Sequence, residues 1–317
     1  ETTITGSQSK EKLCSFSKEY LFAHKIDTTI VLTIDQLTPE LWSPVSPVLY
    51  NLTLKAGKQT FQKRIGFRKF EMRNGTFYLN GKPIYLRGNA INPPGRGIPD
   101  QLGQSKEFAR DYVRYMKSLH INIIRIPDSQ NWMDVCDEEG MMIFAGRYGR
   151  PKHATKTAPP QDFELSLKTY KEIDLGPFTS HPSVVIYILS NEMPYEGKVG
   201  DLYRDFLARM HQELQKWDST RLYIGNAGYG LGKSADIYDV HRYWGWYYNT
   251  FLTYLNMRDK NMWQNPGKTQ PITFTECVGS YTGVDGRFNL CSRTKQPGSQ
   301  KCWTGHLPDS EQAEAAM

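Results

Sequence analysis

The sequence has no apolar run long enough to cross a membrane, and it shows no signal peptide. It also has no run of basic residues, because lysines and arginines are interleaved with acidic residues although the net charge is +6. This pattern indicates a mildly cationic surface and argues against a nucleic-acid-binding stripe. We therefore expect neither a membrane nor a nucleic acid as a partner. The chain starts at Glu1 instead of Met, so we expect the natural N-terminus to be missing.

Cysteine is scarce, with five residues: Cys14, Cys136, Cys277, Cys291 and Cys302. They follow no metal-ligand spacing, and their odd number argues against a fold built on disulfides. Only Cys291 and Cys302 are close enough in one loop-like region to suggest a disulfide. The compartment stays open on this evidence, with a periplasmic or secreted location favoured over the cytoplasm.

A phosphate-binding loop is also lacking, because the glycines of RGNAINPPGRG do not have GxGxxG spacing. The histidines are too dispersed to predict a metal cluster. A nucleotide- or metal-dependent enzyme therefore lacks support.

What is present fits a soluble protein with a sizeable core, since 39% of the 317 residues are hydrophobic and 23% are charged. This length suits one large barrel or two domains. Aromatic residues make up 13% of the chain. Aromatic rings often stack on sugars or bases, although they more often pack in the core.

The N-terminal part reads as β structure. Short β-branched or alternating runs are TTIVLTID (28–35), VLYNLTLKAG (48–57) and KQTFQKRIGFRKFEM (58–72), and AGK (56–58) resembles a hairpin turn. These strands predict part of an antiparallel sandwich.

After Arg68, strands alternate with helices. A hairpin with Asn80-Gly81 as its turn leads into a predicted strand at 84–87. Helical spacing follows at 108–119, a short helix ends at Gly140, and a longer helix begins with Asp201 as its predicted cap. Further predicted strands are INIIRIP, MMIFAG, VVIYIL, RLYIGN, DIYDVHRYW and PITFTEC, with a helical segment around TFLTYLNMRDKNMW.

Such alternation predicts a parallel sheet covered on both faces. Seven predicted strands after residue 80 favour a (β/α)8 TIM barrel that lacks its last strand. An open doubly wound sheet is the alternative.

Two carboxylates stand at the ends of predicted barrel strands. Glu192 ends the fourth strand and Glu276 the seventh, so they would face each other across the mouth of the barrel. A pair of facing carboxylates can cleave a glycosidic bond, and the gap between them distinguishes retaining from inverting enzymes. A lone glutamate after a strand is usually a solvated loop residue. Two glutamates at the ends of suitably spaced strands favour a catalytic role instead.

Several segments resemble glycoside hydrolase family 2, the family of β-galactosidases, β-glucuronidases and β-mannosidases. HPSVVIYILSNE resembles its acid/base signature, PITFTEC its nucleophile strand and MDVCDEEGMMIF its second helix and third strand. LWSPVSPVLYNL and IGFRKFEMRNGTFYLNGKPIYLRG resemble its passage from an immunoglobulin-like domain into the barrel. The resemblance covers residues 41–277. It implies a partial immunoglobulin-like β-sandwich at 1–68 and a catalytic barrel at 69–317.

The resemblance also implies roles for individual residues. Glu192 would be the general acid/base and Glu276 the nucleophile of a retaining mechanism. Asn191 would bind the sugar 2-hydroxyl, Arg125 would lie near the nucleophile, and Tyr243 would hydrogen-bond it. For Arg125 the plainer alternative is a structural ion pair, and for Tyr243 it is a packed aromatic.

Other residues are candidates for substrate contact. His241 and Trp244 could line the sugar site, while core packing is the alternative for these rings. Arg87, Asn89 and Asn92 are predicted to lie at the end of the first barrel strand, where they could contact substrate hydroxyls or hold the following loop.

The implied function is that of a retaining, exo-acting β-glycosidase, β-galactosidase-like, acting on terminal β-linked sugars of oligo- or polysaccharides. The alternatives are a β-glucuronidase- or β-mannosidase-like enzyme and an inactive carbohydrate-binding barrel. No cofactor is required, although a structural or site cation is compatible. A carbohydrate is the expected partner, and a homo-oligomer is compatible.

Two departures limit what the resemblance implies. Asn92 stands about where the family usually has a histidine, and IPDSQ replaces its usual SHYP-like segment. The identity of the substrate sugar therefore cannot be transferred from the best-known family members. No eighth strand follows Glu276, so we expect the chain to be part of a longer enzyme.

Overall fold

The computed structural model describes residues 1–19, 31–90, 102–125, 129–147, 149–194, 196–241 and 269–276.

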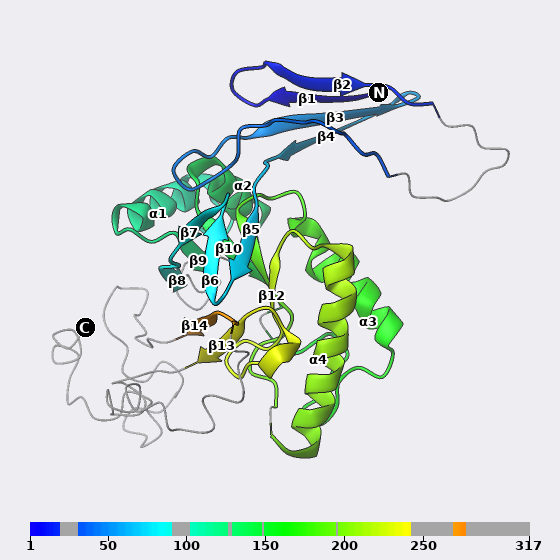
Figure 1. Ribbon diagram of the computed structural model, residues 1–317, viewed down its shortest axis with the longest axis vertical. Coiled ribbons are helices and arrows are strands. Elements are labelled where there is room, and N and C mark those ends of the chain that lie inside the picture. Colours follow the sequence, from blue (N-terminus) through cyan, green and yellow to red (C-terminus); the bar gives the residue numbers. More distant parts are fainter. Residues whose placement is uncertain are drawn as a thin grey trace.

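The N-terminal region is a four-stranded antiparallel sheet (Figure 1). Its strands, in the spatial order β2-β1-β3-β4, are β1 (Thr2–Gly6), β2 (Lys12–Phe16), β3 (Tyr50–Ala56) and β4 (Gln59–Ile65). The predicted turn between β3 and β4 is confirmed, with Gly57 in the left-handed region. The predicted strand at 28–35 is wrong over 31–35, where the chain is irregular and Val31 is 80% exposed, so burial of an apolar face does not favour a strand there. The strands β1 and β2 were not predicted.

A second, three-stranded antiparallel sheet follows: β5 (Phe70–Arg73), β6 (Thr76–Leu79) and β7 (Lys82–Ile84). The predicted Asn80-Gly81 turn is confirmed. Both residues have positive φ, as the tight two-residue hairpin turn requires. The predicted strand at 84–87 is wrong, because Ile84 already ends β7 and the first parallel strand begins at Gly88.

Seven parallel strands among the described residues then follow one another in sequence order. They are β8 (Gly88–Ala90), β9 (Ile123–Arg125), β10 (Met142–Gly146), β11 (Val184–Ile188), β12 (Leu222–Ile224), β13 (Tyr238–His241) and β14 (Ile272–Glu276). Strands β8 to β12 form one parallel sheet, β13 pairs with β14, and a parallel bridge between Ile224 and Ile237 joins the two groups. The predicted parallel arrangement is confirmed, but the described residues do not form a closed barrel.

In the described part of the chain, four α-helices lie between these strands: α1 (Lys106–Ser118), α2 (Gln130–Glu139), α3 (Phe163–Thr169) and α4 (Gly197–Trp217). The Ser105 hydroxyl caps α1 by accepting a hydrogen bond from the Phe108 N–H. Gly140 ends α2 in the left-handed conformation, as predicted. The predicted cap at Asp201 is wrong, since α4 begins at Gly197 and Asp201 lies inside it, paired with Arg204.

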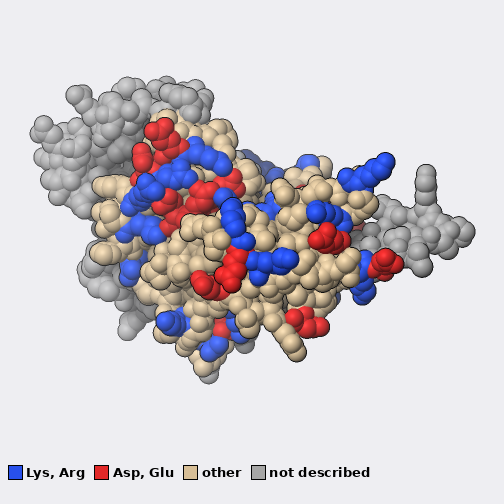
Figure 2. All heavy atoms as spheres, turned by 90° about the horizontal axis from the view of Figure 1, so that it is seen from above, with Lys and Arg blue, Asp and Glu red and all other residues tan. Residues whose placement is uncertain are grey.

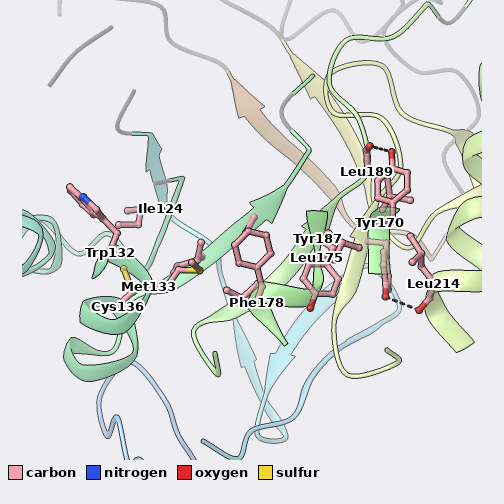
Figure 3. Packing of buried hydrophobic residues seen from close by; sticks show 14 of the residues in the cluster. Ile124, Trp132, Met133, Cys136, Tyr170, Leu175, Phe178, Tyr187, Leu189 and Leu214 are labelled. Carbon is pink, nitrogen blue, oxygen red and sulfur yellow. Dashed lines mark hydrogen bonds between the residues drawn. The ribbon is translucent and has the colours of Figure 1, made fainter. Parts of the chain in front are cut away.

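The parallel sheet separates two apolar layers. Along β11 and just beyond it, Tyr187 and Leu189 pack in the layer that the helices cover (Figure 3), whereas Ile186 and Ile188 pack in the layer on the other face. That second layer includes Phe70 and residues of β6, so the small hairpin sheet covers part of this face. Both faces of β11 are buried, which explains its unbroken apolar run.

The N-terminal sheet packs against the end of the barrel strands where they begin. The Trp42 indole donates to the Asp137 carbonyl at 2.9 Å, and Arg64 pairs with Glu138 at 2.6 Å, both just before β10. A cavity of about 1210 Å³ between the two regions is lined by residues that include Tyr50 and Glu139, so it lies away from Glu192 and Glu276. Acidic and basic side chains are intermixed on the face drawn in Figure 2. No described helix is long and apolar enough to span a bilayer.

Candidate active site

Four polar side chains meet where the parallel strands end. Arg125, His241 and Glu276 are the last residues of β9, β13 and β14, and Glu192 follows β11 by four positions. In a β/α barrel this is the end at which active sites are built. The apolar strands therefore deliver charged groups to one edge of the sheet.

Glu192 stands on a turn that the segments following β10 and β12 hold in place. Its N–H donates to the Ala227 carbonyl at 2.9 Å, and the preceding Asn191 N–H donates to the Gly149 carbonyl at 3.1 Å. The buried Asn226 side chain completes the turn by bonding both backbone groups of Met193. Glu192 has a φ of +52°, which is uncommon for a residue other than glycine and is often found at functional sites.

Glu276 is positioned by an ion pair and by a β-bulge. Arg125 Nη1 lies 2.9 Å from Glu276 Oε1, and both side chains are about one-fifth exposed, at 21% and 22%. On β13, Asp239 pairs with Thr273 and His241 with Glu276, so β14 carries one extra residue in this interval. The bulge brings Glu276 level with His241 at the rim of the sheet, a place where bulges often re-aim a side chain.

The two carboxylates approach each other across this edge. One oxygen of Glu192 and one of Glu276 lie within 4.8 Å of each other. The Glu192 side chain is 43% exposed, whereas Glu276 is 22% exposed. Retaining glycosidases hold their two carboxyl groups about 5–5.5 Å apart, and inverting enzymes hold them farther apart to admit a water molecule.

His241 connects the two carboxylates. Its side chain is only 3% exposed, and its Nδ1 lies 2.8 Å from Glu192 Oε1 and 3.7 Å from Glu276 Oε2. Its Nε2 lies 3.0 Å from the Thr275 hydroxyl. Burial lowers the pKa of His241, but the hydrogen bond that the charged ring donates to Glu192 and the nearby charges of Asp239 and Glu276 outweigh burial and raise this pKa above its ordinary value.

Glu192, His241 and Glu276 are the described residues whose donor atoms are close enough to hold a metal ion. Each donor is already engaged, however. Arg125 bonds Glu276, and the contact of 2.8 Å between Glu192 and His241 has the length of a hydrogen bond. We therefore interpret this group as a proton-sharing and ion-paired network instead of a ligand set.

The structure places the other predicted site residues differently. Asn191 adjoins Glu192, and no described residue bonds its side-chain amide. Asn89 contacts the Met116 sulfur of α1. The placement of Arg87 at the end of the first barrel strand is wrong: it precedes β8, and its guanidinium donates to the His120 carbonyl at 2.7 Å, at the opposite edge of the sheet.

Several predictions fall on residues that lie outside the described part of the chain. They are Tyr243, Trp244, Asn92, the pair Cys291 and Cys302, and the helical segment around 250–263.

Sequence reasoning missed three residues that shape the site. Asp239 is fully buried and accepts four hydrogen bonds, Thr275 bonds His241, and Gly228 lies against the His241 ring. A sequence pattern could have identified two of them, Asp239 and Thr275. Polar residues alternate in YDVH (238–241) and in TFT (273–275), which indicates one polar face on each of two neighbouring barrel strands.

Family models match the chain in two consecutive parts. The model "Glycosyl hydrolases family 2, TIM barrel domain" matches residues 70–304, and the model "Glycosyl hydrolases family 2" matches residues 2–68. The chain belongs to glycosyl hydrolase family 2. The resemblance inferred from the sequence is thereby confirmed, and so is the TIM barrel domain to which the parallel strands belong.

Proteins of similar sequence include β-galactosidases. The chain is 29% identical over 234 residues to a β-galactosidase of Halalkalibacterium halodurans, an alignment that covers 63% of this chain and 22% of the relative. It is 26% identical over 191 residues to a β-galactosidase of Leuconostoc mesenteroides, covering 56% of this chain and 18% of the relative. The chain therefore spans only about a fifth of the length of these relatives.

A solved structure shows the same fold. The crystal structure of a Parabacteroides merdae β-glucuronidase superposes with a TM-score of 0.63 at 24% identity, covering 86% of this chain and 34% of the other. At this identity the similarity speaks for the fold alone.

Proposed function

We propose that the chain carries the catalytic centre of a retaining, exo-acting β-glycosidase that hydrolyses terminal β-linked sugars, with β-galactosides as the leading substrates. The observation that carries the proposal is the approach of Glu192 and Glu276 to within 4.8 Å, with Arg125 bonded to Glu276. This spacing suits direct attack by a carboxylate better than activation of an intervening water.

The roles follow from the surroundings of each carboxylate. Glu276 is paired with Arg125, and a neighbouring cation favours the ionised form that a nucleophile needs. Glu192 is the more exposed of the two and contacts His241, which suits a group that gives up and takes back a proton. Asn191 adjoins Glu192, and its side-chain amide has no hydrogen bond to a described residue, which supports a role for Asn191 in binding the hydroxyl next to the reacting carbon.

In the first step Glu276 attacks the anomeric carbon while Glu192 protonates the departing glycosidic oxygen. In the second step Glu192 removes a proton from water, whose oxygen attacks the same carbon and releases Glu276. The chemistry needs no cofactor.

A β-glucuronidase-like enzyme is the second candidate, because a β-glucuronidase has the same fold. The sugar distinguishes the two. The retained Glu192, Glu276 and Arg125 favour either enzyme over an inactive carbohydrate-binding barrel, for which two carboxylates have no chemical use.

The test is hydrolysis of a panel of nitrophenyl β-glycosides (galactoside, glucuronide, mannoside, glucoside and fucoside) by the protein as its gene encodes it. We expect turnover of one sugar, galactose first, with loss of activity in both Glu192→Gln and Glu276→Gln. The anomeric configuration of the first product, followed by NMR, should be β. An α product would refute retention, and no turnover by folded protein would favour the binding barrel.

A further inference from the structure

The hydrogen bonds behind His241 fix which of its ring nitrogens carries a proton. The chain of bonds starts at Asp239, whose carboxylate is fully buried. Its Oδ1 accepts from the Thr273 hydroxyl at 2.6 Å and the Thr275 N–H at 3.1 Å. Its Oδ2 accepts from the Gly228 N–H at 2.8 Å and the Thr275 hydroxyl at 2.7 Å. All four partners are donors, so Asp239 acts only as an acceptor.

Thr275 passes this constraint to the histidine. A hydroxyl has one proton to donate, and the Thr275 hydroxyl donates it to Asp239. Its oxygen can therefore only accept from His241 Nε2, which lies 3.0 Å away. It follows that Nε2 carries a proton whether His241 is neutral or charged.

The other ring nitrogen then faces Glu192 with a single proton between them. If Glu192 is protonated, it donates to a neutral Nδ1, and if Glu192 is ionised, a charged His241 donates to it. Both arrangements satisfy the contact of 2.8 Å. Among the described residues, the charged groups that face His241 are Glu192 from the turn after β11, Asp239 from β13, and Glu276 from β14 with its partner Arg125 from β9.

We propose that His241 is a positioning residue that shares the acid/base proton with Glu192, held in the required tautomer by Thr275 and Asp239. This proposal rests on the proposed function for its catalytic consequence. In the first step the shared proton leaves with the glycosidic oxygen. In the second step a proton from water returns to the Glu192–His241 pair, so the pair begins and ends the cycle with one proton.

The direct test is nitrogen NMR of histidine-labelled protein, which does not need an active enzyme. We expect His241 Nε2 to stay protonated throughout the titration while Nδ1 titrates. In Glu192→Gln the His241 pKa should fall, because its anionic partner is lost. A neutral His241 with its proton on Nδ1, or a titration unchanged in Glu192→Gln, would overturn the proposal.

The kinetic test compares two leaving groups on the sugar that the enzyme hydrolyses. A phenyl glycoside needs an acid to leave, whereas a 2,4-dinitrophenyl glycoside leaves without one. In His241→Asn we expect kcat/KM for the phenyl glycoside to fall about 10- to 100-fold, which is part of the roughly 10²- to 10⁴-fold that general acid catalysis contributes, while kcat/KM for the dinitrophenyl glycoside changes by less than about twofold. The pH profile for the phenyl glycoside should also shift.

Two further variants separate this role from a structural one. Thr275→Val keeps the shape of the side chain but removes the hydroxyl, so it should reproduce part of the leaving-group effect. His211→Asn, another buried histidine, lies on α4 and should leave the ratio of the two substrates unchanged. Equal losses on both substrates in His241→Asn would overturn the proposal, whereas no hydrolysis by wild-type protein would overturn the proposed function and leave the NMR test to decide on His241.

Discussion

His181 and His241 each place ring Nδ1 against a carboxylate, near opposite ends of strand β11. His181, just before the strand, lies 2.6 Å from Asp137, and both side chains are at most 4% exposed. His241 lies 2.8 Å from Glu192, which follows the strand and is 43% exposed. The two contacts have nearly the same length, but only the second carboxylate can be reached by a substrate.

The second ring nitrogens also differ. His181 Nε2 lies 2.8 Å from the Gln130 amide nitrogen, which also donates to Asp134, so the His181 nitrogen accepts and the proton lies on Nδ1. Asp137 further accepts from the Ser183 N–H at 3.0 Å, which fixes the start of β11. His181 Nδ1–H thus donates permanently to Asp137 in a buried hydrogen-bond network. His241 has the opposite tautomer and an exposed partner, so the same residue types serve stability at one end and proton exchange at the other.

The largest expected effect concerns the nucleophile. Glu276→Gln should lower kcat/KM on the order of 10⁴-fold, because an amide cannot attack the anomeric carbon. Circular dichroism should show an unchanged fold, since the group lies at the rim of the sheet. Activity within tenfold of wild type would show that Glu276 is not the nucleophile.

At the other end of β11, the same kind of change should affect folding instead of catalysis. Asp137→Ala leaves the His181 Nδ1–H and the Ser183 N–H buried without an acceptor, at a cost of about 1–3 kcal/mol for each. Urea titration should therefore show a free energy of unfolding lower by about 2–6 kcal/mol. Asp111→Ala, an exposed position on α1, is the control and should change it little. Equal stability of the two variants would contradict the structural role of Asp137.

Gly228→Ala should disturb the His241 end alone. Gly228 has a φ of +94°, and an added Cβ would lie 2.7 Å from the His241 ring. The strained backbone and displaced ring should lower stability by about 1–3 kcal/mol. The kcat/KM for substrates with poor leaving groups should fall more than the loss of folded protein alone would cause. Thermal unfolding together with the two-substrate comparison checks this, and unchanged activity would show that the ring position does not matter.

The smallest effect is the pH dependence of stability. The pKa of His241 is raised in the folded protein, so its contribution is complete below the unfolded pKa of about 6.5. That contribution is lost as pH rises through the folded value. The free energy of unfolding should decline above about pH 6.5, and His241→Asn should flatten this slope. If the free energy of unfolding depends on pH equally in wild type and variant, His241 is not the source of this dependence.

Local sequence determined much of this architecture. The apolar run of β11, the stop of α2 at Gly140 and the tight turn at Asn80-Gly81 follow from burial, the left-handed preference of glycine and hairpin chemistry within a few residues. The placement of Glu192 and Glu276 at strand ends follows in the same way. These features could be predicted because each depends on neighbours along the chain.

The site itself was decided by tertiary structure. Two strands separated by 30 residues set the register that brings Glu276 level with His241, and no local pattern encodes a bulge between them. The wrong placement of Arg87 has a related cause, because the hairpin pairing of β7 ends at Ile84 and shifts the first parallel strand along the chain. The sequence determined which groups reach the rim of the sheet, and long-range strand pairing decided which atoms meet, because a shift of one residue redirects every side chain after it.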